Sequence, residues 1–240
     1  MIHPVLAPRR PLWRVLILPA LLGVAMIGWT VFWFHAASTT ESLIDGWRDR
    51  EARSGRAFEC GDRHLAGYPF RLEVSCRKTR FEWTTSAKPI TADLAETLFV
   101  ADVFDPLALN AEFSSPLRVS EANFGRGLTV SWKSARANLV GLPTAPRRVA
   151  LSFDGPAARW DAPNGASSPF QADHAELRAR MVSGSPTDNP VIEIALKLVA
   201  ARAGAVHLIA EDTFDGDLAV TLRGLKDFSP KPWPERLREL

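Results

Sequence analysis

One uncharged and almost wholly apolar run, from Val15 to Phe34, limits what this chain can fold into. A helix of this run spans roughly 30 Å at 1.5 Å per residue, which matches the hydrocarbon core of a bilayer. Trp13 lies just before the run, and Trp29 and Trp33 lie in its last turns, where aromatic rings favour the membrane interface. The run therefore predicts a transmembrane anchor at residues 15–34.

Charge on the two sides of the run predicts its orientation. Arg9, Arg10 and Arg14 precede it, whereas every acidic residue follows it. The positive-inside rule then places a basic tail, residues 1–14, in the cytoplasm and the bulk of the chain outside. A cleaved signal peptide ending near residues 36–38 is the alternative, but a signal core has only about 7 to 15 apolar residues, so we favour a retained anchor. Both interpretations export the remaining chain.

The net charge of +2 belongs to the tail rather than to the exported part. Without the three arginines before residue 15, 26 basic side chains remain against 27 acidic ones. Binding of nucleic acid requires a basic surface, so we expect no nucleic-acid partner. The exported residues are numerous and apolar enough to form a folded core.

The chain has only two cysteines, Cys60 and Cys76, and both lie in the exported part. An oxidising compartment favours their pairing, so we expect a Cys60–Cys76 disulfide. Two free buried thiols are the alternative.

A stalk helix is predicted between the anchor and the rest of the chain, at residues 38–54. Ser38 and Glu41 have the spacing of a capping box, and apolar residues then recur at helical intervals. Ser54 and Gly55 supply a helix end.

The exported domain, residues 57–240, alternates apolar and polar residues with a period of two, which is typical of strands. Turn sequences such as 154–156, 163–165 and 183–186 separate the strands. The expected fold is mainly β: a transmembrane helix and a stalk helix, then a twisted antiparallel β meander that forms a curved sheet or a sandwich. Residues 92–105 fit a helix or a strand, residues 196–205 have a competing helical interpretation, and residues 234–240 resemble the start of a helix.

Signatures of catalysis or metal binding are not evident in the sequence. The five histidines are scattered and none lies in a zinc-binding or metalloprotease motif. An acidic stretch at residues 211–217 is best explained as a hairpin turn rather than a calcium site. Asp173, His174 and Glu176 are close in the chain, but neighbours on a strand face opposite ways. We therefore expect no enzyme activity, no cofactor and no metal.

The most distinctive local string is Gly67, Tyr68, Pro69, Phe70, Arg71 and Leu72, which by itself predicts a turn leading into a strand. Together with the anchor, Trp47 in the stalk and the two cysteines, it resembles a family of bacterial inner-membrane-anchored proteins of unknown function. The resemblance implies a periplasmic location for the C-terminal domain, and a chain that is shortened at its C-terminus.

The same string is similar, more distantly, to AsmA-like envelope proteins, whose curved sheets have an apolar concave face associated with lipid traffic. A meander of half-apolar strands would offer a groove suited to acyl chains, although the same residues suit a closed core. The expected function is therefore a membrane-anchored envelope domain that binds or handles lipid. The alternative is a scaffolding domain that binds another envelope protein. Candidate groove or core residues are Phe70, Leu72, Val74, Leu128, Val130, Trp132, Ile192, Ile194, Leu196, Leu218, Val220 and Leu222.

Overall fold

The computed structural model describes residues 13–84, 89–121, 127–141, 146–161, 167–185, 188–203 and 213–223. The chain divides into two compact units, Met1–Leu43 and Ile44–Leu240, which are described separately. The predicted helix at residues 234–240 and the first two acidic positions of the stretch 211–217 lie outside the described residues.

One helix, α1 (Trp13–Arg53), covers both the predicted anchor and the predicted stalk. Its segment from Leu16 onward is long and apolar enough to cross a membrane, with a mean hydropathy of 2.0 in its most apolar window. The prediction that Ser38 begins a separate helix is wrong, because the Ser38 hydroxyl donates to the carbonyl of His35 one turn earlier, within the helix. Residues 35–38 contain neither proline nor glycine, so nothing interrupts the helix there.

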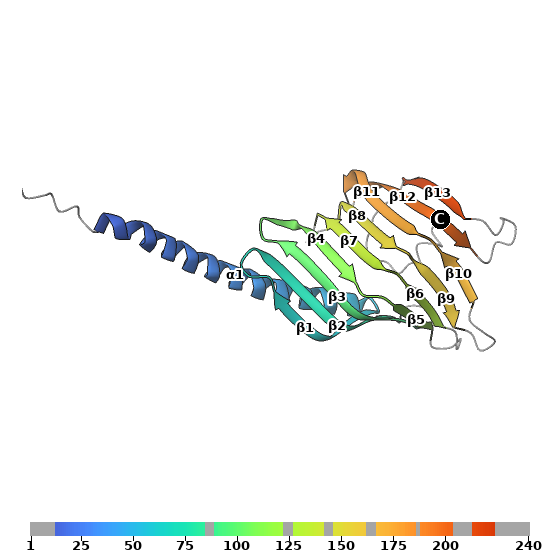
Figure 1. The fold of residues 1–240 in the computed structure, drawn as a ribbon, viewed down its shortest axis with the longest axis horizontal. Coiled ribbons are helices and arrows are strands. Elements are labelled where there is room, and N and C mark those ends of the chain that lie inside the picture. The colour runs from blue at the N-terminus through green and yellow to red at the C-terminus, as the bar shows by residue number, and fades with distance from the viewer. Residues whose placement is uncertain are drawn as a thin grey trace, which may run out of the picture. The chain divides into compact units, whose positions relative to one another are not determined.

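Every strand in the described residues belongs to one antiparallel sheet, which confirms the mainly β fold and makes it a single sheet rather than a sandwich (Figure 1). The strands are β1 (Arg56–Ala66), β2 (Arg71–Trp83), β3 (Ile90–Asp102), β4 (Asp105–Phe113), β5 (Leu117–Glu121), β6 (Gly127–Ser131), β7 (Ser134–Val140), β8 (Arg148–Asp154), β9 (Ala157–Asp161), β10 (Ser167–Gln171), β11 (His174–Ser185), β12 (Asp188–Ala203) and β13 (Phe214–Leu222).

The topology is an up-and-down meander in which four of the long strands are each broken into two pieces. The pieces are β4 and β5, β6 and β7, β8 and β9, and β10 and β11. β3 shows the arrangement, because residues 97–102 pair with β4 while residues 90–93 pair with β5 on the same edge. In the same way, β7 pairs with β8 and β6 pairs with β9. Each broken pair is therefore one strand with an interruption near its middle.

The two ambiguous segments are both strands. Residues 92–102 lie in β3, and residues 196–203 lie in β12, so the helical interpretations are wrong for these residues. Pairing explains the outcome: β3 bonds to β2 along its whole length, and β12 bonds to β11 on one edge and β13 on the other. Such long-range pairing overrides the helix preference of alanine and leucine.

Candidate functional site: a creased apolar face

One face of the sheet is apolar from strand to strand. Residues that lie directly opposite each other in the register point to the same face. Following one such row across the sheet gives an apolar residue on each strand that the row crosses: Leu65, Val74, Phe99, Ala111, Ala137, Leu151, Leu177, Leu196 and Leu218. We call this side the apolar face.

The neighbouring row points to the opposite side and is almost entirely polar. It consists of Ser75, Leu98, Glu112, Arg136, Ser152, Glu176, Lys197 and Asp217. We call this side the charged face. The separation of the two kinds of residue fixes the register, since a slip by one residue would exchange the faces.

A line of interruptions crosses the sheet, and we call this line the crease. On the apolar face, residues normally recur every second position, but at the crease two successive members are three positions apart. The pairs are Cys76 and Thr79, Leu94 and Thr97, Trp132 and Ala135, Phe153 and Pro156, Ala172 and Ala175, and Leu198 and Ala201. Each of these strands thus contains one additional residue, as in a β-bulge, and bulges bend the strands that carry them.

Backbone geometry at the crease is unusual, while the pairing of the strands continues through it. Lys78 and Ala200 have positive φ angles of 54° and 49°, which non-glycine residues adopt rarely. The Lys133 amide donates to the Asp154 carbonyl at 2.8 Å, and the Gly155 amide donates to the Asp173 carbonyl at 2.7 Å. The crease is therefore an ordered bend of one sheet.

Side chains from the two sides of the crease meet on the apolar face. Trp132, Leu94 and Ala135 form a buried cluster, against which Phe113 and Phe153 pack. The Trp132 indole N–H donates to the Phe113 carbonyl at 2.9 Å, and its ring lies 5.6 Å from the Phe153 ring. These contacts pack the side chains of the two sides against each other across the crease.

Burial on the apolar face is greatest at the crease. The exposed fraction is 0% at Ala201 and 8% at Trp132, which lie at the crease, but it reaches 42% at Trp160 near the end of β9 and 59% at Leu218 in the edge strand β13. Leucine and isoleucine side chains between these extremes, such as Leu151 and Ile194, are half-buried. The apolar face is therefore a trough whose floor is the crease, and the described residues provide no second sheet to cover it.

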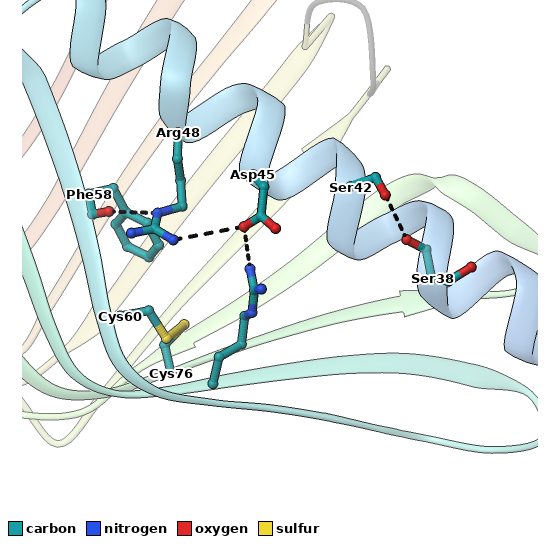
Figure 2. A network of polar contacts seen from close by, with 8 residues as sticks. Ser38, Ser42, Asp45, Arg48, Phe58, Cys60 and Cys76 are labelled. Atoms are coloured by element: carbon teal, nitrogen blue, oxygen red, sulfur yellow. Dashed lines mark hydrogen bonds and ion pairs between the residues drawn. A yellow bond between two sulfur atoms is a disulfide. The ribbon is translucent and has the colours of Figure 1, made fainter.

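The last turns of α1 lie on the apolar face at β1 (Figure 2). Trp47 packs on Phe58 with 5.6 Å between the ring centres. The Arg48 guanidinium donates to the Phe58 carbonyl at 3.0 Å. Further along β1, the Arg63 guanidinium is paired with the Asp45 carboxylate at 2.9 Å. These contacts attach residues 44–53 to the edge of the trough.

The predicted disulfide is confirmed, and it lies beneath this helix segment (Figure 2). Cys60 in β1 is bonded to Cys76 in β2, with Cα atoms 5.3 Å apart. The two residues are not opposite each other in the register, because Cys60 faces Thr79 and Cys76 faces Arg63. The bond therefore connects the two sides of the crease.

The candidate groove residues fall on this surface with one exception. Leu72, Val74, Leu128, Val130 and Trp132 belong to the apolar face, as do the candidates of β12 and β13. Phe70 instead lies in the turn before β2, where its ring stacks on Phe104. Sequence reasoning missed the residues that β3, β4, β7, β8 and β11 contribute to the apolar face. In all of these strands except β4, the three-residue spacing at the crease is the signal that could have found them.

Comparison with known proteins identifies the family. The model of a family described as an uncharacterized protein conserved in bacteria (DUF2125) matches residues 33–240. The chain belongs to this family. No curated protein and no solved structure shows significant similarity to the chain. The match covers the whole creased sheet, so this fold is that of a DUF2125 protein.

The string Gly67–Leu72 forms the turn between β1 and β2 and the first two residues of β2 in this DUF2125 protein. The Arg71 amide donates to the Gly67 carbonyl at 2.9 Å and closes the turn. Gly67 has a φ of +101°, and a Cβ atom there would lie 2.6 Å from the Arg71 carbonyl oxygen. Only glycine fits this position without a shift of the backbone.

The charged face of this family member is crossed by ion pairs. Arg80 pairs with Asp93 at 2.7 Å, and Arg180 pairs with Glu193 at 2.6 Å. Two shallow depressions of about 400 Å³ each lie against polar residues of this face, such as Glu112 in one and Arg159 in the other. Both depressions are open and are lined by acidic, basic and apolar side chains. They are therefore not selective for a ligand of one charge.

A Ser–Asp–His cluster lies on the charged face next to the crease. Asp154 accepts a hydrogen bond from the Ser134 hydroxyl at 2.5 Å and lies 2.8 Å from His174 Nδ1. The Ser134 hydrogen bond, followed by that of His174, holds the pKa of the Asp154 carboxyl below its usual value of 3.8. Ser134 and His174 both contact the Asp154 carboxylate, so the aspartate lies between the other two residues. In a catalytic triad it is the histidine that lies between the serine and the aspartate.

The remaining weak candidates have structural contacts. Asp215 accepts the backbone N–H of Ala200 at 2.8 Å, which stabilises the crease residue of β12 from β13. Glu176 holds Arg178 at 2.6 Å on the charged face. Among the residues that the structure describes, no group of three or more metal-binding side chains comes together.

Proposed function

We propose that this protein is a membrane-anchored envelope domain that binds lipid along its creased apolar face. The observation that carries the proposal is the trough itself: an apolar face whose side chains on both sides of the crease, such as Leu128, Leu151 and Ile194, remain half-buried. Soluble proteins rarely expose apolar patches of more than a few hundred Å², and such patches are usually binding sites. The distant resemblance to AsmA-like envelope proteins is in agreement.

The crease is long enough to hold an acyl chain along its whole length. Strands lie about 4.8 Å apart, so a crease that passes from β1 to β12 is roughly 35 Å long. The whole hydrocarbon core of a bilayer, which two opposed acyl chains fill, is about 30 Å thick. Apolar walls with few polar groups are the usual surroundings of a bound lipid tail.

The proposed location is the periplasmic side of a bacterial inner membrane, with the N-terminus in the cytoplasm. The basic tail before α1 and the absence of acidic residues before position 35 support this orientation. The Cys60–Cys76 disulfide supports an oxidising compartment. No catalytic role is proposed, because the Ser134, Asp154 and His174 cluster has no hydrogen bond between nucleophile and base.

Photo-crosslinking in intact cells tests the lipid proposal. Leu151 and Ser152 are neighbours in β8 with similar, intermediate exposure, but they point to the apolar and the charged face respectively. A photoreactive phenylalanine analogue is placed at one or the other position of the full chain. We expect lipid adducts, identified by mass spectrometry, at position 151 and at least fivefold fewer at position 152. Equal yields, or no lipid at 151, would contradict the proposal.

The edge strand β13 supports the second candidate, a scaffolding domain. β13 pairs with β12 on one side, and the described residues place no strand on its other side. Its side chains Leu218, Val220 and Leu222 are exposed. An edge of this kind can add a strand from another protein. A discrete protein adduct from a crosslinker at Ala219, without lipid adducts at 151, would favour this function instead.

A further inference from the structure

Two hairpin turns at one end of the sheet form an exposed aromatic surface, which we call the aromatic tip. It consists of Tyr68 and Phe70 in the turn between β1 and β2, and of Phe104 and Leu107 at the turn between β3 and β4. Their exposed fractions are 52%, 55%, 72% and 53% respectively. Large apolar side chains at turns are unusual in a soluble domain, where turns are typically polar.

The aromatic tip is an ordered structure. The Phe70 and Phe104 rings are stacked with 6.0 Å between their centres. The Val103 amide donates to the Phe70 carbonyl at 3.0 Å, and this bond joins the two turns. The Asp102 carboxylate accepts the Phe104 amide at 2.9 Å and so positions that ring. The two turns thus present their aromatic rings together.

The tip lies at the end of the sheet from which the chain enters the domain. Along the contact between residues 44–53 and β1, the residue numbers rise in the helix while they fall in the strand. Asp45 is paired with Arg63, and Arg48 is bonded to Phe58. The helix segment and β1 are therefore antiparallel, and β1 continues past Arg63 towards the side on which residue 44 begins. At about 3.3 Å per residue, Tyr68 lies about 16 Å beyond Arg63 in that direction.

The length of the connection to the apolar run matches this distance. Phe34 ends the run and precedes Asp45 by 11 positions. A helical connection of this length covers about 16 Å at 1.5 Å per residue. The length of this connection therefore limits how far the domain can lie from a membrane that holds the run, and this limit is similar to the reach of the tip.

We propose that the aromatic tip docks on the surface of the lipid bilayer in which the N-terminal helix is anchored. Tyrosine and other amphipathic aromatic side chains favour the interfacial layer of a bilayer, and exposed phenylalanine gains free energy by insertion among the acyl chains. Arg71, which follows Phe70 and is exposed, suits the anionic lipid headgroups there. The domain then has two attachments, which orient the trough relative to the membrane. This inference rests on the proposed anchoring and is independent of lipid binding in the trough.

Depth-dependent quenching in liposomes tests the docking. The full chain is reconstituted into vesicles of phosphatidylethanolamine and phosphatidylglycerol, with an environment-sensitive fluorescent amino acid at position 104. The matched control carries the same amino acid at Arg118, an exposed position of β5 on the other side of the crease. Nitroxide-labelled lipids are expected to quench position 104 at least threefold more than position 118. Equal quenching overturns the proposal.

A second variant removes the anchoring rings while the fluorescent residue remains at position 104. With Tyr68→Ser and Phe70→Ser, the quenching at 104 is expected to fall by at least half, while the Cys60–Cys76 disulfide and the circular dichroism remain unchanged. Unchanged quenching in the folded double variant overturns the proposal, as does a protein crosslink at 104 in place of lipid contact. The two proposals can fail separately. If only lipid binding in the trough is wrong, no lipid adducts form at Leu151 while the quenching at position 104 remains.

Discussion

Trp132 and Ala135 are three positions apart, yet both side chains are buried on the apolar face, with exposed fractions of 8% and 3%. In a regular strand, residues at this spacing point to opposite faces. At the crease, the one additional residue in the strand returns Ala135 to the apolar face. The neighbouring strands contain an additional residue at the equivalent place. The bend of the sheet and the continuity of the apolar face therefore depend on the same residues.

Deletion of Lys133 is expected to abolish the native fold. Removing the additional residue would restore regular alternation in this strand, so that Ala135, Ala137 and Leu139 could no longer keep their pairing with the creased neighbouring strands. We expect a loss of more than about 4 kcal/mol in the free energy of unfolding, measured by urea denaturation of the full chain in detergent. Lys133→Ala keeps the spacing and removes only an exposed side chain, so it should stay within about 0.5 kcal/mol of the parent. Similar stability of the two variants would contradict the role of the crease.

Trp132→Ala should destabilise the domain by about 3 to 5 kcal/mol, because it empties the centre of the buried cluster. Trp132→Phe keeps most of the ring but removes the N–H bonded to the Phe113 carbonyl, and about 1 kcal/mol is expected from this loss. Trp160→Ala is the matched control, since Trp160 lies on the same face with 42% of its surface exposed. Thermal unfolding followed by circular dichroism measures all three, and an equal effect at 132 and 160 would refute the assignment.

Local patterns predicted most of the strands, because alternation of apolar and polar residues depends only on the nearest neighbours. Val130 and Ile194 were recognised in this way. The crease was not recognised, since a spacing such as that from Trp132 to Ala135 resembles the gap between two separate strands. Alanines at its floor, including Ala111 and Ala137, also carry a weak hydrophobic signal. The single sheet, rather than a sandwich, follows from strand pairing over long distances in the chain.

The features with chemical interest depend on register and could not be read from the sequence. Asp154 and His174 meet because they are opposite each other in β8 and β11, and Ser134 is opposite Asp154 in β7. Phe104 joins Phe70 only because the sheet brings two turns to the same end. The disulfide was predictable, because only two cysteines occur and both follow the apolar run.

The Cys60–Cys76 bond should stabilise the domain by about 3 kcal/mol, as the chain-entropy model gives for a closed loop of this size. A variant with both cysteines replaced by alanine is expected to unfold at a correspondingly lower urea concentration. Addition of a reductant should lower the stability of the parent and leave the double variant unaffected. If the parent in cells carries two alkylatable thiols, the proposed compartment is wrong.

The carboxyl of Asp154 should titrate below its usual pKa of 3.8, because Ser134 and His174 stabilise its charged form. A carboxyl with a lowered folded-state pKa stabilises the fold above the unfolded-state pKa, and this contribution disappears as the pH falls through the folded-state value. The carboxyl carbon shift in an NMR titration measures the pKa directly. Ser134→Ala should raise it towards 3.8, and His174→Gln should raise it less, since the Ser134 bond is the larger cause. An unchanged pKa in Ser134→Ala would contradict this explanation.

Gly67→Ala should destabilise the domain by at least about 2 kcal/mol, since the residue combines a positive φ angle with a crowded Cβ position. The added methyl group would lie 2.6 Å from the Arg71 carbonyl oxygen and would force the turn to open. Gly216→Ala in β13 is the matched control, because the nearest atom to its Cβ position is 3.7 Å away, in the Phe214 side chain, and its φ angle is not in the left-handed region. Urea denaturation of both variants measures the difference. Because the turn carries Tyr68 and Phe70, Gly67→Ala should also lower the lipid quenching at position 104, and Gly216→Ala should not. An equal response of the two variants in both measurements would show that the turn has no special requirement for glycine.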